Sequence, residues 1–386
     1  MPIRYLTAGE SHGKGLTVIL EGIPARLPLT AVEIDTDLAR RQKGHGRGGR
    51  MRIEQDRVRI LSGVRHGLTL GSPIALFIEN IDYASWEALM RPEPPAIPGR
   101  VLTRPRPGHA DLAGGMKYAQ TDLRNILERA SARETAARVA AGAVARKLLS
   151  VAGITVQSHV VRIGSATSEV ALLDLKRLNA CADASPVRML NPAAEKKAMR
   201  LIDGASRKGD TLGGVFEVVV DGCPPGLGSH VQWDRRLDGR LAQAMMSMQA
   251  IKGVEIGRGF ELATQPGSKV HDAIGHSRRR GYFRFTNRAG GIEGGMTNGE
   301  PVVVRAAQKP IATLRKPLLS VDIRTKKKAS AGYERSDICA VPAGSVIGEA
   351  ICAWTLADAL MEKTGGDHLG EVLARCRAYR AHLKGY

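Results

Sequence analysis

The sequence is poor in aromatic residues and cysteine, and it has no long apolar run. Phe, Trp and Tyr make up 4% of the 386 residues, which leaves few rings on which unpaired bases can stack. The five cysteines are scattered, odd in number and never spaced as CxxC, so we expect neither a disulfide framework nor a zinc site, in keeping with a reducing cytoplasm. No run approaches the about 18 apolar residues of a membrane-spanning helix. The first residues, Met1 to Leu6, lead directly into a strand-like pattern, and we expect no signal peptide.

The charge of the chain is strongly one-sided. Lys and Arg number 57 and Asp and Glu 38, and the net charge of +19 predicts anionic partners such as nucleic acid, an acidic membrane or small polyanions. The basic residues are dispersed and interleaved with glycine, with short runs at Arg278-Arg279-Arg280 and Lys326-Lys327-Lys328. The net charge alone does not exclude nucleic acid as the partner, so we turn to the residues that surround the cations.

The apolar pattern predicts one large α+β domain over residues 1–386. Hydrophobic residues form 43% of the chain, enough for a sizeable core, and no linker or low-complexity segment divides it. Short β-branched or apolar runs indicate strands at 16–20, 74–78, 215–220 and 302–304. We expect helices from a Ser131–Glu134 capping box to about residue 150, and at 234–249, 345–363 and from 367 onward. Two helix-then-strand units, 135–161 and 235–260, hint at an internal duplication.

Two histidines stand in loop-like settings suited to proton transfer. His12 lies in Gly9-Glu10-Ser11-His12-Gly13, and His109 follows the stiff segment Arg104-Pro105-Arg106-Pro107-Gly108. Because histidine titrates near neutral pH, an exposed one between small residues can act as a general acid. A surface-turn histidine is the alternative for His12. A Ser–His nucleophile pair is also conceivable, but the glycine spacing is not that of a nucleophile elbow.

Cations alternate with glycine between Arg40 and Arg50. Guanidinium groups bind phosphate and carboxylate in bidentate fashion, and glycine lets backbone N–H groups approach the same anion. An RNA-binding loop rich in Arg and Gly is the alternative. The segment lies between regular elements and not in a repetitive tail, which favours a small-anion site. Arg129 and Arg133 flank the helix start at Ser131, where cations oppose the helix dipole unless an anion binds; exposed arginines beside a plain cap are the alternative.

Two later segments also carry polar or glycine-rich patterns. Five glycines between Gly290 and Gly299 predict backbone pressed against a flat or bulky ligand, although the spacing is not that of a dinucleotide-binding fingerprint. Asp337, in Arg335-Ser336-Asp337, precedes a predicted helix, where a lone aspartate is usually a cap or an ion-pair partner.

Taken in order, these segments resemble the chorismate synthase family over nearly the full length of the chain. One such motif is weakly specific, whereas six in the family's order are highly specific. The segments that carry the resemblance are Gly9-Glu10-Ser11-His12-Gly13, Arg106-Pro107-Gly108-His109-Ala110-Asp111, Ser131-Ala132-Arg133-Glu134-Thr135, Lys252-Gly253-Val254-Glu255-Ile256-Gly257, Gly290-Gly291-Ile292-Glu293-Gly294-Gly295 and Arg335-Ser336-Asp337.

The resemblance implies a reaction, a fold and an assembly. The family converts 5-enolpyruvylshikimate 3-phosphate to chorismate by a 1,4-anti elimination of phosphate, in the shikimate pathway to aromatic amino acids. It requires reduced FMN, although the reaction involves no net redox change. The implied fold is a β-α-β sandwich with helices between antiparallel sheets. The implied protein is a cytoplasmic homotetramer that acts on a small molecule and binds neither nucleic acid nor membrane. Whether it reduces its own flavin with NADPH or depends on an external reductase is left open.

The resemblance also assigns roles to individual residues. His12 resembles the histidine that supplies a proton toward the leaving phosphate, His109 the one that protonates near the reduced flavin and holds it in its anionic form, and Asp337 the acid beside the flavin's central-ring nitrogen. The implied anion clamp for the substrate consists of Arg41, Arg47, Arg50, Arg106, Arg133 and Arg335. The implied flavin contacts are Arg129, Ala130, Ser131, Gln249, Ala250, Gly294, Lys309, Pro310, Ile311, Ala312, Thr313 and Arg335, with Arg41 and Arg47 as NADPH contacts and no metal.

Overall fold

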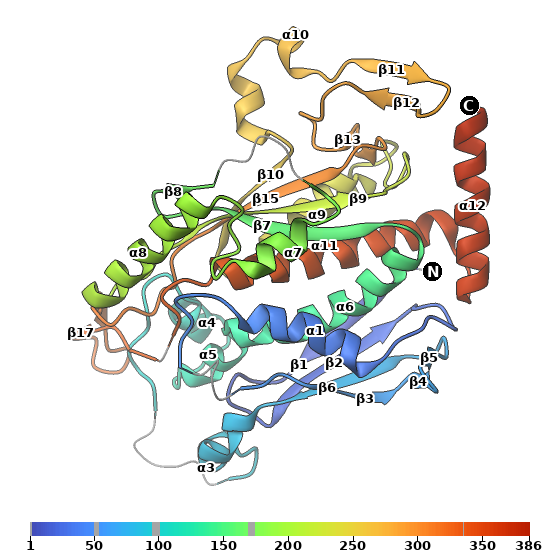
Figure 1. Cartoon of the computed structure of the whole chain (residues 1–386). Helices are drawn as coiled ribbons and strands as arrows, with labels where there is room; N and C mark the ends of the chain where they lie inside the picture. Colours follow the sequence, from blue (N-terminus) through green and yellow to red (C-terminus); the bar gives the residue numbers. More distant parts are fainter. Residues whose placement is uncertain (1, 50–53, 95–100, 169–173, 335) are drawn as a thin grey trace.

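Two antiparallel sheets enclose a layer of helices in the computed structural model, which describes residues 2–49, 54–94, 101–168, 174–334 and 336–386 (Figure 1). The predicted site residues Arg50 and Arg335 lie outside these described residues. The arrangement confirms the sandwich expected from the sequence.

The first sheet has four strands in the order β1-β2-β6-β3. Its strands are β1 (Arg4–Ala8), β2 (Gly15–Glu21), β6 (Ile74–Glu79) and β3 (Val58–Ser62), all paired antiparallel. Leu16, Val18 and Leu20 alternate along β2 and are fully buried, because every second side chain of a strand points to the same face. That face packs against the helices.

The second sheet has five strands in the order β10-β15-β9-β7-β8 and is also antiparallel. Its strands are β7 (Thr155–Ile163), β8 (Ala166–Thr167), β9 (Gly214–Asp221), β10 (Ile251–Ile256) and β15 (Val302–Gln308). The predicted helix-then-strand units exist as α6–β7 and α9–β10, with both strands in this sheet. A duplication behind them stays a prediction.

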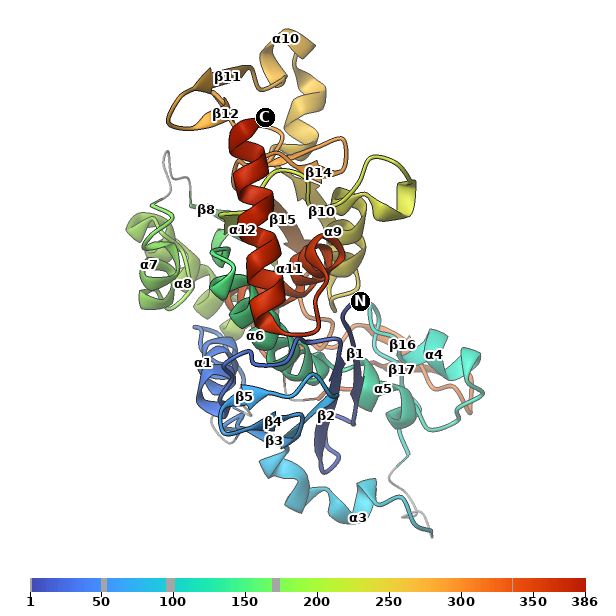
Figure 2. The same cartoon turned by 90° about the vertical axis from the view of Figure 1, so that its right-hand side faces the viewer.

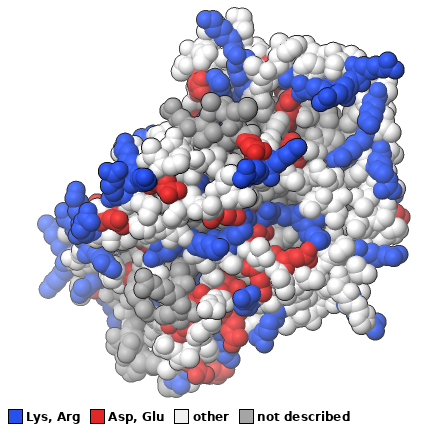
Figure 3. Space-filling model, in the orientation of Figure 1, with Lys and Arg blue, Asp and Glu red and all other residues white. Residues whose placement is uncertain are grey.

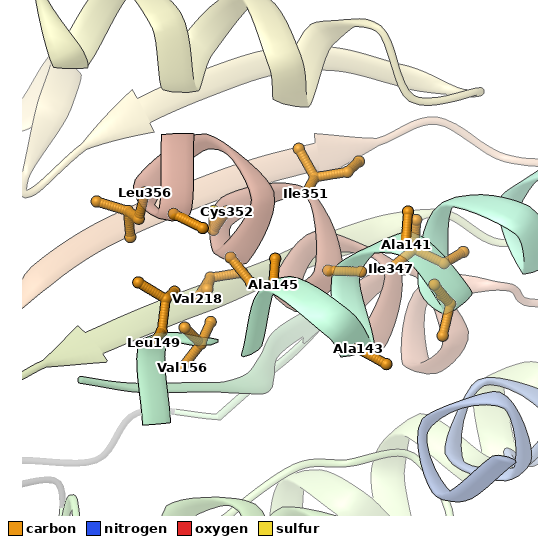
Figure 4. Close-up of a cluster of buried hydrophobic side chains, with 14 of the residues drawn as sticks. Ala141, Ala143, Ala145, Leu149, Val156, Val218, Ile347, Ile351, Cys352 and Leu356 are labelled. Carbon is orange, nitrogen blue, oxygen red and sulfur yellow. The ribbon is translucent and has the colours of Figure 1, made fainter. Parts of the chain in front are cut away.

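The middle layer contains α1 (Ala31–Gln42), α6 (Thr135–Val151) and α11 (Val341–Thr364). α6 contacts β2 and β6, whereas α11 contacts β7 and β9. The two helices approach closely because small residues face each other: a Cβ added at Gly142 would lie 2.3 Å from the Cβ of Ala350. Figure 4 shows Ala145 of α6 and Cys352 of α11 in one apolar cluster.

Helix α11 is, within the described part of the chain, the one helix long and apolar enough to cross a membrane. In this structure 94% of that stretch is buried inside the protein, which is the environment of a core helix.

A buried carboxylate ties the layers together. Glu349 on α11 accepts hydrogen bonds from Arg40 of α1 at 2.8 Å and from the Ser158 hydroxyl of β7 at 2.7 Å. Arg146 and Arg188 lie 3.3 and 3.2 Å from the same carboxylate. Burial by itself would raise the pKa of Glu349, but the surrounding guanidinium charges lower it to about 2.

The remaining elements surround this sandwich. Figure 2 shows α12 (Leu369–Gly385) running across one end of the helix layer. The other helices are α3 (Glu87–Met90), α4 (Asp111–Lys117), α5 (Arg124–Ala130), α7 (Leu178–Ala184), α8 (Pro192–Lys208), α9 (Leu237–Met246) and α10 (Gly267–Val270). Short 3-10 turns are η1 (Ile81–Ser85), η2 (Ala132–Glu134), η3 (Trp233–Arg235) and η4 (Gly259–Thr264). Short strand pairs are β4 (Val64–Arg65) with β5 (Leu68–Thr69), β11 (Ile274–Ser277) with β12 (Gly281–Arg284), β13 (Ile292–Glu293) with β14 (Met296–Thr297), and β16 (Leu319–Val321) with β17 (Lys328–Ser330).

The predicted strands and helices are present, but the starts of three helices differ, and the helix expected from residue 345 already begins at Val341. The helix expected from Ser131 begins at Thr135, after the turn η2 that the Ser131 hydroxyl caps by accepting from the Arg133 N–H. The Glu134 carboxylate does not complete the capping box, because it accepts instead from Thr7 and Arg138. The helix expected at 234–249 is shorter, since its first residues form the turn η3.

Candidate functional site

A cavity of about 410 Å³ lies where α6 and α11 begin. Ala132 and Thr135 line it at the start of α6, and Ala340 and Ala343 line it at the start of α11. The positive dipole ends of two long helices therefore meet at this cavity, which favours bound anions. Segments that are distant in sequence complete its walls, with lining residues in the stretches 11–12, 41–49, 82–86, 106–110, 248–250 and 308–313 and at 334, 336 and 337.

His12 lies on one wall of the cavity and is held by a buried carboxylate. Its Nδ1 is 2.9 Å from Glu128 Oε1, and its ring stacks on Trp86 with centroids 4.0 Å apart. Arg124 donates to Glu128 at 3.1 Å and lies over the Trp86 ring. Burial by itself would raise the pKa of Glu128, but the hydrogen bonds and charge of His12 and the charge of Arg124 lower it, so the carboxylate stays ionised.

His109 is held in the same manner on another wall. Its Nδ1 is 2.5 Å from Asp111 Oδ1, and Arg106 donates to Asp111 Oδ2 at 2.8 Å. Arg106 also donates to the Thr313 hydroxyl at 2.9 Å, which fixes the guanidinium across the cavity wall. Burial by itself would raise the pKa of Asp111, but the hydrogen bonds from His109 and Arg106 hold it well below its usual range.

Two buried arginines share one aspartate at the back of the cavity. Arg41 Nη1 is 3.3 Å from Asp56 Oδ2, and Arg133 donates to the other oxygen of Asp56. Burial lowers the pKa of Arg41 to about 10, with Arg133 and Arg47 adding to the effect that Asp56 only partly offsets. Glu54 lies 3.9 Å from Arg133, so two buried carboxylates accompany the two guanidinium groups, and both arginines also line the cavity, where they can bind an anion.

Arg47 pairs with Asp337 at the cavity mouth. Arg47 Nη1 donates to Asp337 Oδ2 at 2.6 Å, and the Gly48 N–H donates to Asp337 Oδ1 at 2.6 Å. The Gly46 carbonyl accepts from the Ile338 N–H at 2.8 Å, so the loop that carries Arg47 is fastened to the segment that carries Asp337. The structure thus brings His12, His109, Asp337, Arg41, Arg47, Arg106 and Arg133 to one cavity.

Most of the expected flavin contacts line the same cavity. These residues are Ala130, Ser131, Gln249, Ala250, Lys309, Pro310, Ile311, Ala312 and Thr313. Lys309 donates to the Gly108 carbonyl at 2.7 Å, and its pKa is lowered by burial and by the nearby Lys252 charge. Two buried polar atoms of lining residues, Gln249 Oε1 and Arg47 Nε, find no partner among the described residues. Such atoms are commonly satisfied by a ligand or water.

Two expected contacts lie elsewhere in the chain. Arg129 donates to the Thr7 hydroxyl and carbonyl at 2.7 and 2.8 Å and lines a separate, more open hollow beside β1. Gly294 lies exposed between β13 and β14, away from the cavity-lining segments. Neighbouring glycines allow backbones to pack there, since a Cβ at Gly290 would lie 2.3 Å from the backbone nitrogen of Gly257. Flavin contacts at Arg129 and Gly294 stay predictions.

Sequence reasoning missed the carboxylates that hold the two histidines. Asp111 follows His109 by two residues within a motif that was already noted, so the His-x-Asp spacing was an available signal. Glu128 lies 116 residues from His12, and no local pattern joins them. Trp86 and Asp56 likewise reach the site only through the fold.

Fold and site together define a class: an α+β sandwich enzyme whose buried, cation-rich cavity takes anionic small molecules and contains two carboxylate-held imidazoles. Comparisons with known proteins then identify the family. The family model described as chorismate synthase matches residues 3–361. Chorismate synthase of Moorella thermoacetica is 60% identical over 384 residues, covering 99% of each chain. That of Aquifex aeolicus is 59% identical over 397 residues, covering 100% of this chain and 99% of its own.

A solved structure agrees with these relatives. A crystal structure of chorismate synthase superposes with a TM-score of 0.81 at 49% identity, covering 100% of this chain and 99% of that one. The chain belongs to the chorismate synthase family. This confirms the family and, with it, the carbon–oxygen lyase activity in the shikimate pathway that the sequence predicts.

Proposed function

We propose that this cavity binds reduced FMN and 5-enolpyruvylshikimate 3-phosphate together and that the 1,4-anti elimination of phosphate takes place there. One observation carries the proposal: His12, His109 and Asp337, which are distant in sequence, line a single cavity with four arginines. Proton donors, a carboxylate and a surplus of buried cations are the groups that the departure of a phosphate from a polyanion requires.

The arginines are the proposed anion clamp. The substrate carries a phosphate and two carboxylates, and FMN adds a second phosphate, so the cavity has to neutralise several negative charges. Arg41 and Arg133, which share Asp56, line the cavity with their guanidinium groups and can bind the phosphate and carboxylates of the ligands. The N-termini of α6 and α11 add to the same field. Arg50 and Arg335 remain predicted members of the clamp.

The lining residues fit a flavin. A flat apolar ring suits the side chains of Met248, Ala250, Ile311, Ala312 and Ile347, which form much of the wall. Its polar edge and phosphate suit Ser131, Gln249, Lys309 and Thr313 on the same cavity. When bound, reduced FMN supplies electron density to the C–O bond that breaks. The protein's part is to hold substrate and cofactor in contact and to exclude water, which strengthens each electrostatic interaction.

The two histidines and Asp337 handle protons. We assign to His12 the proton delivered toward the leaving phosphate and to His109 the proton held near the flavin. Each imidazole is fixed at Nδ1 by an ionised carboxylate, which orients the ring, as the buried aspartate does in a hydrolase triad. Asp337 lies beside the cavity mouth and accepts from Arg47, so a substrate anion that engages Arg47 would release this carboxylate for the proton lost from the ring carbon.

Assembly and location complete the proposal. We infer a homotetramer in the cytoplasm, with no nucleic acid or membrane as partner. Large apolar side chains on the outside of the chain, such as Trp233, Phe260 and Phe285, support burial between subunits. The free state of all five cysteines suits a reducing compartment. Light scattering after size exclusion tests the tetramer.

The deciding experiment is an anaerobic assay of the purified protein with chemically reduced FMN, measuring chorismate and released phosphate. Equal amounts of chorismate and phosphate are expected. If neither product forms, the proposal is overturned. A parallel assay with oxidised FMN and NADPH tests whether the chain reduces its own flavin: turnover there supports NADPH binding at Arg41 and Arg47. Turnover restricted to prereduced FMN assigns reduction to another enzyme.

A further inference from the structure

A cluster of exposed cations lies on one hairpin beside the cavity. We call residues 315–328, which include β16 and the start of β17, the cationic hairpin. Its cations make no ion pair with any residue that the structure describes and are all exposed: Arg315, Lys316, Arg324, Lys326, Lys327 and Lys328. Its one acid, Asp322, already accepts from the Thr103 hydroxyl and from the backbone N–H groups of Arg324 and Thr325.

Both ends of the cationic hairpin join the cavity wall. The chain leaves the wall at Thr313, which accepts from Arg106, and returns to it at Glu334. Between these points the Ser320 hydroxyl donates to the Pro105 carbonyl at 2.6 Å, and the Ile323 N–H donates to the Thr103 carbonyl at 2.9 Å. The exposed cations are therefore fastened next to the segment that carries Arg106 and His109.

Helix α8 extends the same charged surface. The Lys316 N–H donates to the carbonyl of Gly209, which caps α8, and Arg207 and Lys208 occupy the last turn of that helix. Figure 3 shows Lys and Arg side chains gathered along the edge of the molecule where α8 and β17 lie in Figure 1. Exposed cations of α8 and of the cationic hairpin thus lie together at one edge of the molecule, and the hairpin connects that edge to the cavity wall.

We propose that the cationic hairpin is an electrostatic guide that draws the phosphorylated dicarboxylate substrate from solvent into the cavity. The proposal rests on the proposed function. The cavity arginines are buried and partly neutralised by Asp56, Asp111 and Asp337, so their field reaches solvent weakly. Exposed, unneutralised cations beside the cavity raise the local concentration of an anion and its rate of arrival, and salt screens this effect.

The test compares two charge reversals of equal size. The guide variant is Lys327→Glu with Lys328→Glu; Lys326 is left unchanged because its backbone has a φ of +60°. The control is Arg278→Glu with Arg279→Glu, two exposed residues in the β11–β12 turn at the far side of the molecule (Figure 1). Steady-state kinetics are measured anaerobically with saturating reduced FMN, at salt concentrations of about 20 mM and about 500 mM.

The guide variant is expected to lose on the order of 10-fold in kcat/KM for 5-enolpyruvylshikimate 3-phosphate at low salt, with kcat unchanged. The loss should disappear at high salt, and the control should stay within about twofold of the parent. Equal losses in both variants, a loss that persists at high salt, or no loss would each overturn the guide. The guide would also be overturned if the guide variant kept its kinetics and lost only salt-dependent RNA binding, because the surface would then be a nucleic-acid-binding site.

Calorimetric titration of the substrate separates the guide from the reaction. If the parent binds the substrate and the guide variant binds it more weakly at low salt only, the guide stands even when no chorismate is made. In that case the proposed function fails alone. If both proteins bind equally at low salt while the parent turns over normally, the guide fails alone.

Discussion

Arg47 donates to the Asp337 carboxylate at 2.6 Å, although the two residues are 290 positions apart in the chain. The contact joins the glycine-rich loop after α1 to the segment before α11 at the mouth of the cavity. In the proposed mechanism, an anion that binds the guanidinium of Arg47 would release the Asp337 carboxylate. Removing only the charge of Asp337 distinguishes two roles: a catalytic base would lose turnover, whereas a residue with a purely structural ion pair would not.

Replacing Asp337 by Asn keeps the shape and removes the charge. We expect turnover to fall by a factor on the order of 10² or more, while FMN affinity stays within about threefold. Anaerobic turnover with prereduced FMN and an absorbance titration of the flavin measure the two. The matched control is Asp238→Asn, whose partner Arg236 lies outside the cavity lining. Near-normal turnover in Asp337→Asn would remove this residue from the mechanism.

Glu128 should act through His12. We expect His12→Ala to slow turnover by a factor on the order of 10² or more, and Glu128→Gln by a smaller factor, on the order of 10, because the imidazole remains but loses the carboxylate that holds its ring in place. The loss in Glu128→Gln should fall on kcat, with KM for the substrate within about twofold of the parent. Glu261→Gln, which alters an exposed ion pair with Arg258, is the control. An unchanged kcat in Glu128→Gln would reduce Glu128 to a packing role.

His109 and its partner Asp111 should behave as a parallel pair. We expect His109→Ala to slow turnover by a factor on the order of 10² or more, measured with prereduced FMN. The loss should be accompanied by an altered spectrum of the bound reduced flavin, since the proposed role of His109 is next to the cofactor. Full activity in His109→Ala would exclude that role.

Variants of Lys309 and Arg129 test whether FMN binds in the cavity or in the neighbouring hollow, because Lys309 lines the first and Arg129 the second. Lys309→Ala should weaken FMN binding by about 10-fold or more, because a charge-assisted hydrogen bond is worth roughly 1.5–3 kcal/mol. Arg129→Ala should change it by less than about threefold if its side chain stays on Thr7 as in this chain. Flavin titration measures both. A large loss in Arg129→Ala would mean that its guanidinium reaches the flavin in the assembled protein.

The buried Glu349 cluster should make stability depend on pH in acid. The pKa of Glu349 falls from its ordinary 4.5 to about 2 in the folded protein, so the stabilisation is present above about pH 4.5 and is lost as pH falls toward 2. Urea unfolding across this range measures the loss. Glu349→Gln should flatten that dependence and destabilise the protein by roughly 3–5 kcal/mol at neutral pH, because three arginines lose the most buried of their carboxylate partners. If the stability of Glu349→Gln depends on pH as that of the parent does, Glu349 is not the source of the acid dependence.

The close approach of α6 and α11 is testable at one glycine. Gly142→Ala places a Cβ 2.3 Å from that of Ala350, and we expect destabilisation of about 1–3 kcal/mol as the helices are forced apart. Gly204→Ala on α8 is the control, since a Cβ there meets nothing within 4 Å, and it should stabilise the protein by about 1 kcal/mol. Urea unfolding of both variants measures the difference. Equal effects would mean that the helix interface can relax.

Much of the fold was readable from short-range patterns. The alternation of apolar residues along β2 and β6 and the alanine-rich run of α6 depend on periodicity within a few neighbours, and each element appears where it was expected. Boundaries were less certain, because Glu134 had two competing uses. It could complete a capping box or bind Thr7 and Arg138, and only the approach of β1 decided for the second.

By itself the sequence determined the family and the chemical groups of the site, because histidine, arginine and glycine occur in six ordered motifs whose chemistry does not depend on their partners. Only the tertiary structure decided which groups meet. It paired His12 with Glu128, gave Arg41 and Arg133 one shared aspartate, and turned Arg129 toward β1. These pairings join residues between 15 and 122 positions apart, and they depend on how the sheets and helices pack, which gives distances in space that a linear pattern does not contain.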